Sequence, residues 1–332
     1  MDKLEFGAYQ AVEKCMKVQP GERVVIIADR ETDKIARVIE EANKKVTPRV
    51  TYFIMEDFGA RPLKMPEQIL QALKQADVSF YCAAHADGEF ALFREPIYKW
   101  VAKSRLRHAV MPNISREIME QGMNVDYDEL KKFTAKVFEI LSKARNIRVQ
   151  TALGTDLEVR VGKWKWYQCN GDIKPGKYSN LPDGEVFTSP EDVNGTAVID
   201  GVLGDYLDKK YGLICSNPVR AEIKDCRAVL GSIKCENEAL REEVENYIFR
   251  QSSPNSTRIG EFAMGTNLNL ETLVGNTLQD EKFPSVHIAF GDSLEEDTGC
   301  PYTCDYHIDA VMLKPTVVVD GREIMRQGKY LI

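Results

Sequence analysis

The run Arg23-Val24-Val25-Ile26-Ile27-Ala28, followed by Asp29-Arg30-Glu31-Thr32, decides the fold expected for the amino-terminal half. A short, uninterrupted apolar run between charged residues is typical of a strand buried in a parallel sheet. The turn after this strand has no glycine, whereas a dinucleotide-binding turn needs glycines so that backbone amides can approach a pyrophosphate. We therefore expect a buried parallel strand without a dinucleotide cofactor.

The segments around this strand alternate between strand and helix patterns. Strands are predicted at Val50–Met55, Val78–Cys82 and His108–Met111, and helices at Thr32–Lys44, Gln68–Gln75 and Ile97–Lys103. This alternation indicates a parallel α/β sheet of Rossmann-like type. A helix over Tyr127–Ala144 carries apolar residues at helical spacing, and we expect it to link the two halves of the chain.

The pattern changes after Asn146, where apolar and polar residues begin to alternate. Ile147–Thr151 and Leu157–Val161 predict one β-hairpin, and Thr316–Ile324 predicts another on an Asp-Gly turn. Further strands are expected at Thr196–Ile199, Val219–Ile223 and Ser285–Phe290, with a helix at Glu238–Phe249. The chain is thus predicted to have an α/β domain over residues 1–145 and an antiparallel-rich α+β domain over residues 146–332.

Composition limits the classes of partner. The 332 residues contain 44 Lys plus Arg against 51 Asp plus Glu, a net charge of −7 that disfavours binding to nucleic acid. The apolar runs are far shorter than the ~20 residues that cross a bilayer, and the first residues lack the apolar core of a secretory signal. We expect a soluble, cytoplasmic protein without a membrane partner, whose eight scattered cysteines are free thiols.

Two histidines and an aspartate suggest a metal site. His307 and Asp309 stand two apart in a strand-like run, so both project from the same face, and His287 lies in a second such run. Convergent nitrogen and oxygen donors suit a divalent metal. A hydrogen-bonded His–Asp pair in a β core explains the same spacing, and the pattern alone favours neither interpretation.

Two glutamates share a local pattern. Glu185 and Glu261 each follow a glycine and precede apolar residues, which places each carboxylate close to buried surface. A buried carboxylate must be paired, bind a metal or take up a proton. The alternative for each is an ordinary solvated glutamate in a loop.

Several motifs together resemble a known family. They are, in order, Gly154–Leu157, Leu181–Thr188, Ile259–Glu261, His287–Gly291 and His307–Asp309. Together they resemble the thermophilic metallo-aminopeptidases, the aminopeptidase T and aminopeptidase S family. The resemblance implies an α/β amino-terminal domain that covers the active site, a metal-binding catalytic carboxy-terminal domain, and a homodimer.

The resemblance also implies the chemistry. It assigns one set of residues as ligands of one or two divalent ions such as Zn, Co or Mn: Glu185, Glu261, His287, His307 and Asp309. A metal-activated water would then hydrolyse the amino-terminal residue from a small peptide, and Glu261 would share in catalysis. The family also carries a catalytic tyrosine seven residues after the first metal-binding histidine, and that position is Leu294 here; Tyr302 and Tyr306 do not match it.

A sister branch, the dihydroxypyridine ring-cleaving dioxygenases, provides an alternative. These enzymes hold a single Fe(II) on two histidines and an aspartate, a set that His287, His307 and Asp309 supply here. His85 follows the predicted strand Val78–Cys82 and matches in kind a histidine of this branch, so we expect it to transfer protons in the active site; the alternative is a surface-loop histidine. A third interpretation is a metal-binding scaffold without catalytic activity.

Overall fold

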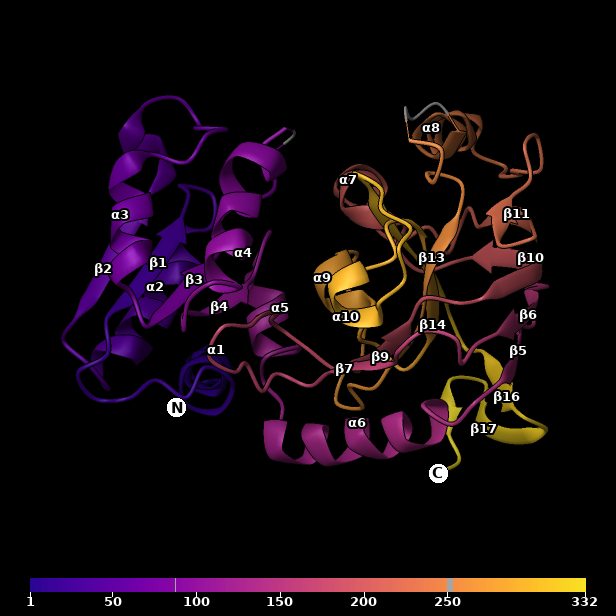
Figure 1. Cartoon of the computed structure of the whole chain (residues 1–332), viewed down its shortest axis with the longest axis horizontal. Helices are drawn as coiled ribbons and strands as arrows, with labels where there is room; N and C mark the ends of the chain where they lie inside the picture. The colour runs from indigo at the N-terminus through magenta and orange to yellow at the C-terminus, as the bar shows by residue number, and fades with distance from the viewer. Residues whose placement is uncertain (87, 250–252) are drawn as a thin grey trace. The chain divides into compact units, whose positions relative to one another are not determined.

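The computed structural model describes residues 1–86, 88–249 and 253–332, which form two compact units (Figure 1). Unit 1 comprises Met1–Lys131 and Asn170–Asp183, and unit 2 comprises Lys132–Cys169 and Gly184–Ile332. The chain passes from unit 1 to unit 2 within α6 (Tyr127–Leu141), returns to unit 1 at residue 170 and leaves it again after residue 183. The end of α6 belongs to unit 2 because its residues Val137 and Leu141 pack in the hydrophobic core of that unit.

Unit 1 is built on a five-stranded parallel sheet with the strand order β2-β1-β3-β4-β8. The strands are β1 (Val24–Ala28), β2 (Val50–Ile54), β3 (Val78–Tyr81), β4 (Arg107–Val110) and β8 (Tyr178–Asn180). The prediction of a parallel α/β sheet is confirmed for the first four strands. The edge strand β8 was not predicted, because three residues without an apolar run carry no strand signal.

Among the described residues, five α-helices accompany this sheet, and the second, third and fourth lie where the sequence predicted helices. They are α1 (Lys3–Tyr9), α2 (Asp33–Lys44), α3 (Glu67–Gln75), α4 (Glu95–Val101) and α5 (Arg116–Glu120). Two further helical segments, η1 (Gln10–Cys15) and η3 (Phe90–Arg94), have π-type hydrogen bonding, and η2 (Met55–Phe58) is a short 3-10 helix. The α3 residues Ile69 and Leu73 and the α4 residue Ile97 pack in one core with Ile27 and Tyr81 of the sheet.

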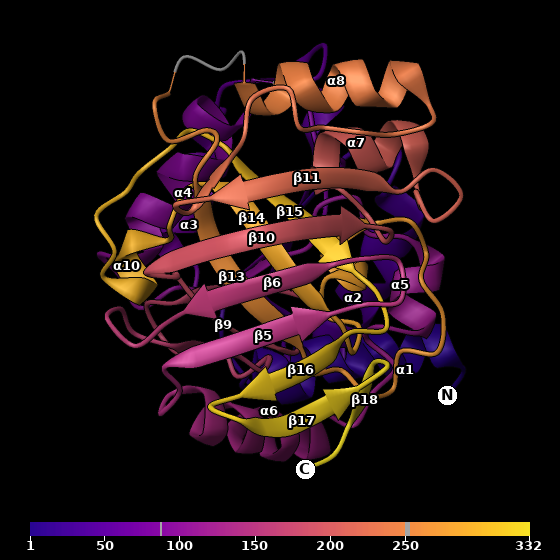
Figure 2. The ribbon, with the colours of Figure 1, turned by 90° about the vertical axis from the view of Figure 1, so that its right-hand side faces the viewer.

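Unit 2 contains two antiparallel sheets (Figure 2). The first has eight strands, in the order β12 (Arg227–Ala228), β11 (Val219–Lys224), β10 (Asp192–Ile199), β6 (Asp156–Arg160), β5 (Asn146–Gln150), β16 (Thr316–Val319), β17 (Arg322–Arg326) and β18 (Lys329–Tyr330). The second has five strands, in the order β15 (His307–Met312), β14 (Val286–Gly291), β13 (Ile259–Gly265), β9 (Glu185–Thr188) and β7 (Tyr167–Cys169). The antiparallel-rich prediction is confirmed.

Besides α6, unit 2 has four α-helices among its described residues. They are α7 (Gly204–Tyr211), α8 (Glu238–Phe249), α9 (Thr277–Asp280) and α10 (Glu295–Thr298). The sequence predicted α8 with the bounds it has, and α6 with an end three residues later than observed. The described helices of the chain include none that is both long and apolar enough to cross a membrane, and all eight cysteines are free.

The two sheets of unit 2 share one hydrophobic core. On β14, Ile288 and Phe290 belong to this core, so the alternation of side chains along a strand directs His287 and Ala289 to the opposite face of the five-stranded sheet. On β15 the same rule separates Ile308, which is in the core, from its two neighbours His307 and Asp309. The five-stranded sheet therefore has one apolar face and one face that carries ionisable groups.

Candidate metal centre

The five residues proposed as metal ligands all lie in the five-stranded sheet of unit 2. Their strands are adjacent: Glu185 opens β9, Glu261 is in β13, His287 is in β14, and His307 and Asp309 are in β15. We call these five residues the acid–histidine cluster. The structure brings together, from four strands, residues that are more than a hundred positions apart in the chain.

The register of the strands leaves room between the side chains of the cluster. Ala289 on β14 is paired with Glu261 on one side and with Asp309 on the other, and Gly291 is paired with His307. Cross-strand neighbours have Cβ atoms about 4.5–5.5 Å apart. Because the β14 residues at these two positions have almost no side chain, the carboxylates beside Ala289 have room between them.

The first half of the cluster surrounds the His287 imidazole. Its Nε2 lies 3.4 Å from Glu185 Oε2 and 3.5 Å from Glu261 Oε1. These distances exceed those of good hydrogen bonds. Two ligand atoms bound tetrahedrally to Zn at about 2.1 Å lie roughly 3.4 Å apart, so this spacing fits a shared metal ion better than it fits direct bonding.

The second half of the cluster surrounds the His307 imidazole. Its Nε2 lies 2.9 Å from Glu261 Oε2 and 3.3 Å from Asp309 Oδ1. Glu261 therefore belongs to both halves, with one oxygen directed to each histidine. Ligand atoms within 4.8 Å of one another form the groups Glu185–Glu261–His287 and Glu261–His307–Asp309.

Two atoms of the cluster, Glu185 Oε2 and His287 Nδ1, are buried without a hydrogen-bond partner among the described residues. Glu185 Oε2 is buried and accepts no hydrogen bond from the described residues, although it faces His287. A buried acceptor without a partner costs about 1–3 kcal/mol, and more when it carries charge. A divalent cation at this position would remove that cost, so the donor set fits a metal.

Burial and charge act in opposite directions on the cluster. Burial raises the pKa of Glu185, whose neighbours Lys282 and His287 only partly offset it. Burial also disfavours charge on Glu261, but the neighbouring imidazoles of His287 and His307 outweigh it and lower the pKa of that carboxyl. Burial opposes protonation of His307 as well, yet Asp309 and Glu261 raise its pKa well above the usual value. Without metal, the cluster therefore favours a protonated His307 beside an ionised Glu261.

A backbone contact orients His307. Its Nδ1 lies 3.2 Å from the main-chain carbonyl oxygen of Asp292, an acceptor that favours the proton on Nδ1 and leaves Nε2 for a metal. The Asp292 side chain is itself held, because it accepts hydrogen bonds from the backbone N–H groups of Leu294 (2.8 Å) and Cys304 (2.9 Å). The loop between β14 and β15 thus fixes the ring orientation.

Sequence reasoning missed two charged residues that lie beside the cluster. Lys282 is 1 % exposed, and its Nζ lies 2.6 Å from Glu185 Oε1 and 2.5 Å from Glu281 Oε1. Glu281 also forms a possible ligand group with His287 and Asp309. The available signal was the charged run Asp280-Glu281-Lys282 shortly before the β14 strand, which reads as an ordinary solvated loop.

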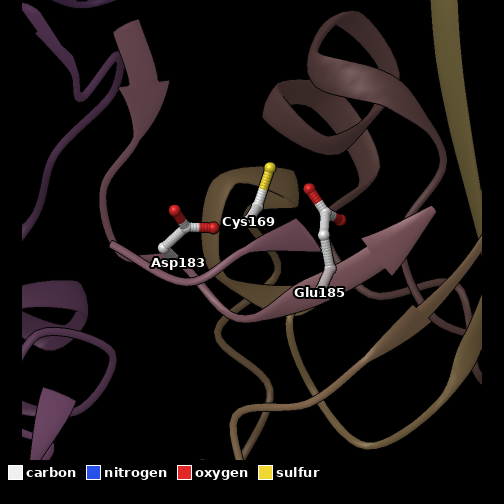
Figure 3. A group of neighbouring side chains, drawn as sticks. All are labelled: Cys169, Asp183 and Glu185. Atoms are coloured by element: carbon white, nitrogen blue, oxygen red, sulfur yellow. The ribbon is translucent and has the colours of Figure 1, made fainter. Parts of the chain in front are cut away.

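A cysteine lies beside the cluster as well. Cys169 on β7 is paired with Glu185 on β9, and Figure 3 shows its thiol beside that carboxylate. Asp183, drawn in the same figure, accepts hydrogen bonds on Oδ2 from the Gly171 N–H (2.8 Å) and the Ser179 hydroxyl (2.9 Å), all within unit 1. We therefore do not count Asp183 as part of the acid–histidine cluster.

His85 lies in unit 1, four residues after β3. Its backbone N–H donates to Asn113 Oδ1 at 2.8 Å, and its side chain is partly buried. The structure describes each unit by itself, so the catalytic role of His85 stays a prediction. A different histidine of this unit, His108, is buried with Nδ1 2.8 Å from Ser79 Oγ, and burial lowers its pKa to about 3.

The position of the family tyrosine has an unusual backbone. Leu294 precedes α10 with φ +53° and ψ +56°, a left-handed conformation that is costly for a branched residue. Of the two nearby tyrosines, Tyr302 stacks under the Arg258 guanidinium at 3.8 Å, and Tyr306 packs against the hydrophobic core. Both tyrosines are therefore engaged in packing contacts.

The chain resembles known proteins in sequence and in fold. The family model "Thermophilic metalloprotease (M29)" matches residues 117–300, more than half of the chain. No curated protein sequence is significantly similar to it. The fold is similar to that of 2,5-dihydroxypyridine dioxygenase from Pseudomonas putida KT2440, with TM-score 0.71 and 17 % identity over 98 % of this chain and 96 % of the other. It is equally similar to that of AmpT from Thermus thermophilus, with TM-score 0.70 and 17 % identity over 99 % of each chain.

Proposed function

Since the chain belongs to the thermophilic metalloprotease (M29) family, we propose that it is an aminopeptidase with a two-ion centre in the acid–histidine cluster. The observation that carries the proposal is the position of Glu261, whose two oxygens face different histidines at 3.5 and 2.9 Å. A carboxylate shared in this way suits a ligand that bridges two ions. Glu185 and His287 would complete one position, and His307 and Asp309 the other.

The distribution of the histidines supports two ions over one. Among the residues that the structure describes, no group of ligand atoms within 4.8 Å of one another contains both His287 and His307. A mononuclear site on two histidines and one carboxylate needs both rings at one ion. The geometry therefore favours hydrolysis over the ring-cleaving alternative.

Divalent ions bound here would supply an activated water and polarise a carbonyl oxygen. Residues of the chain have three roles in the proposed reaction. The cluster holds the ligand atoms in place on four hydrogen-bonded strands. Glu261 takes a shared role as ligand and as acceptor for the proton of the attacking water. His85 is proposed to transfer a proton near neutral pH, because an imidazole both donates and accepts there.

The charge of the site suggests why cleavage would be confined to the amino terminus. The site holds three buried carboxyl groups, those of Glu185, Glu261 and Glu281, and the partly buried carboxyl of Asp309. The Lys282 ammonium pairs with two of them, Glu185 and Glu281. Such an acidic site favours the free α-amine of a peptide, which binds an ion or a carboxylate. An acylated amino terminus has no such amine. We therefore expect small peptides with a free amino terminus as substrates.

A substrate comparison tests this proposal. The chain is stripped of metal with a chelator, reloaded with Zn²⁺, Co²⁺ or Mn²⁺, and assayed on an amino-acyl anilide and on the same anilide with an acetylated amine. We expect hydrolysis of the first substrate only, and only after reloading. Equal hydrolysis of both substrates, or hydrolysis by the stripped protein, would contradict an aminopeptidase.

A dioxygenase remains the second candidate because the fold is also similar to that of 2,5-dihydroxypyridine dioxygenase. The same stripped protein is therefore loaded anaerobically with Fe(II) and given 2,5-dihydroxypyridine. Oxygen uptake upon mixing with air, together with one metal per chain, would support this candidate and count against the aminopeptidase.

A further inference from the structure

Lys282 is an unusual residue to find inside a metal centre. Its side chain is 1 % exposed, although lysine is almost never fully buried unless it is paired. Its ammonium is bound by two carboxylates, Glu185 Oε1 at 2.6 Å and Glu281 Oε1 at 2.5 Å. Lys282 is therefore a fixed positive charge inside a group of acids that otherwise repel one another.

The two oxygens of Glu185 have different surroundings. Oε1 is bound by Lys282, whereas Oε2 accepts no hydrogen bond from the described residues and faces His287 Nε2 at 3.4 Å. Of the two oxygens, Oε2 would therefore be the one free to bind a divalent ion. Such an ion also shares the carboxylate with a cation that is already in place, and the like charges repel each other across one group.

In the other half of the cluster, the described ion pairs join His307 to two carboxylates. The ligand atoms beside His307 are Glu261 Oε2 at 2.9 Å and Asp309 Oδ1 at 3.3 Å. The described ion pairs of the Lys282 ammonium are with Glu185 and Glu281, and its charge also acts on Asp309 without a described ion pair. The repulsion from the ammonium is therefore strongest at the half that contains Glu185 and His287.

We propose that Lys282 is an internal cation that makes Glu185–Glu261–His287 the weaker of two metal positions, so that the first divalent ion binds at Glu261–His307–Asp309. Lys282 is a positioning residue, since it acts through Glu185 and Glu281. This inference rests on the proposed function, because it takes the acid–histidine cluster to be a metal centre. The two can nevertheless fail separately.

The test is an isothermal titration calorimetry experiment in which Mn²⁺ alone is added to the metal-free full chain. Wild type should bind two ions in two steps of different affinity. His287→Ala should remove the weak step, and His307→Ala should remove the strong one. The reverse assignment, or two steps of equal affinity, would overturn the inference.

Lys282→Gln keeps hydrogen-bond donors at the position but removes the charge. We expect the weak step to tighten roughly tenfold or more, because a nearby positive charge has gone. Lys282→Arg, the matched control, keeps the charge and should leave the separation between the steps close to that of wild type. A weak step that is unchanged or weaker in Lys282→Gln would show a purely structural lysine.

Folding of the variant is a further readout. If Lys282→Gln folds only in the presence of Mn²⁺, an external cation has replaced the internal one, which supports the inference; competition with a chelator then gives both affinities. Failure to fold even with Mn²⁺ would overturn it. A wild-type chain that binds no Mn²⁺ would overturn the metal centre itself, whereas two ions bound without any influence of Lys282 would overturn only this inference.

Discussion

Each unit contains a buried group of carboxylates, and the two groups differ in how the negative charges are compensated. In unit 1, Arg61 donates to Asp29 Oδ2 at 2.5 Å, to Glu89 Oε2 at 2.8 Å and to the Tyr81 hydroxyl at 3.2 Å. We call these four residues the arginine network. In unit 2, the acid–histidine cluster places carboxylates against one another and against two imidazoles.

The difference lies in the source of the positive charge. In the arginine network the chain supplies it, and hydrogen bonds from Thr32, Ala84 and Arg61 outweigh burial and lower the pKa of Asp29. In the cluster, Lys282 satisfies one oxygen of Glu185 while the other accepts no hydrogen bond from the described residues. Carboxylates whose oxygens are hydrogen-bonded from within the chain stabilise a fold, whereas a buried carboxylate oxygen without a partner is suited to binding a cation.

The largest effect should come from Glu261→Gln in the acid–histidine cluster. The amide removes one negative charge and replaces one of the two oxygens that face the histidines. One proposed position therefore loses its ligand atom, and the other keeps only a neutral amide oxygen. We expect metal content to fall and anilide hydrolysis to drop by ~10³-fold or more. Glu158→Gln, on the exposed side of β6, is the matched control and should behave as wild type. Full activity of Glu261→Gln would remove this residue from the mechanism.

Arg61→Met should lower the stability of the fold and leave metal binding unchanged. It leaves Asp29 and Glu89 buried without their cation, which typically costs about 3–5 kcal/mol in the free energy of unfolding. Denaturant unfolding of the metal-free chain measures this loss, and metal stoichiometry should stay unchanged. Arg37→Met provides the comparison, because Arg37 is 47 % exposed and its ion pairs contribute below about 1 kcal/mol. Loss of metal from Arg61→Met would contradict the separation of roles.

His85→Ala should lower turnover by about 100-fold, the usual scale for a lost proton-transfer group. Metal content should remain that of wild type, because the proposed ligands are all in unit 2. His108→Ala is not a suitable control, since that ring is buried and bonded to Ser79. His85→Gln serves better, because it retains polarity without a titrating group. Normal turnover in both variants would make His85 structural.

The pH dependence of metal binding should be the smallest effect. Asp309 and Glu261 overcome burial to raise the pKa of His307, so a proton must leave before a metal binds. Metal affinity should therefore rise about tenfold per pH unit and level off above that pKa. The stability that protonated His307 gives the metal-free fold is present below pH ~6.5 and is lost as the pH rises through its folded pKa. His307→Ala should flatten both profiles.

The fold was predictable where local pattern and tertiary environment agree. The uninterrupted apolar run of β1 matches a strand that is buried along its whole length. The alternating residues of β5 and β6 match strands that are buried on one face only. The Tyr178–Asn180 strand was missed because its only strand signal is its pairing with β4, a tertiary contact. The point within α6 at which the chain enters unit 2 also depends on tertiary packing.

The site was predictable in part for a similar reason. The spacing of His307 and Asp309 places both on one face of a strand, and this can be read from the chain. The pairing of Ala289 with both Glu261 and Asp309 cannot, because it depends on the register of three strands. The burial of Lys282 likewise depends on how the loop before β14 folds against β9.

Anomalous scattering from crystals of the chain soaked in Mn²⁺ tests the central claim, a two-ion centre, most directly. The account predicts two peaks, one between Glu185, Glu261 and His287 and the other between Glu261, His307 and Asp309. At limiting Mn²⁺ the second position should fill first. A single peak contacted by both histidines, or no peak at the acid–histidine cluster while metal occupies another site, would contradict it.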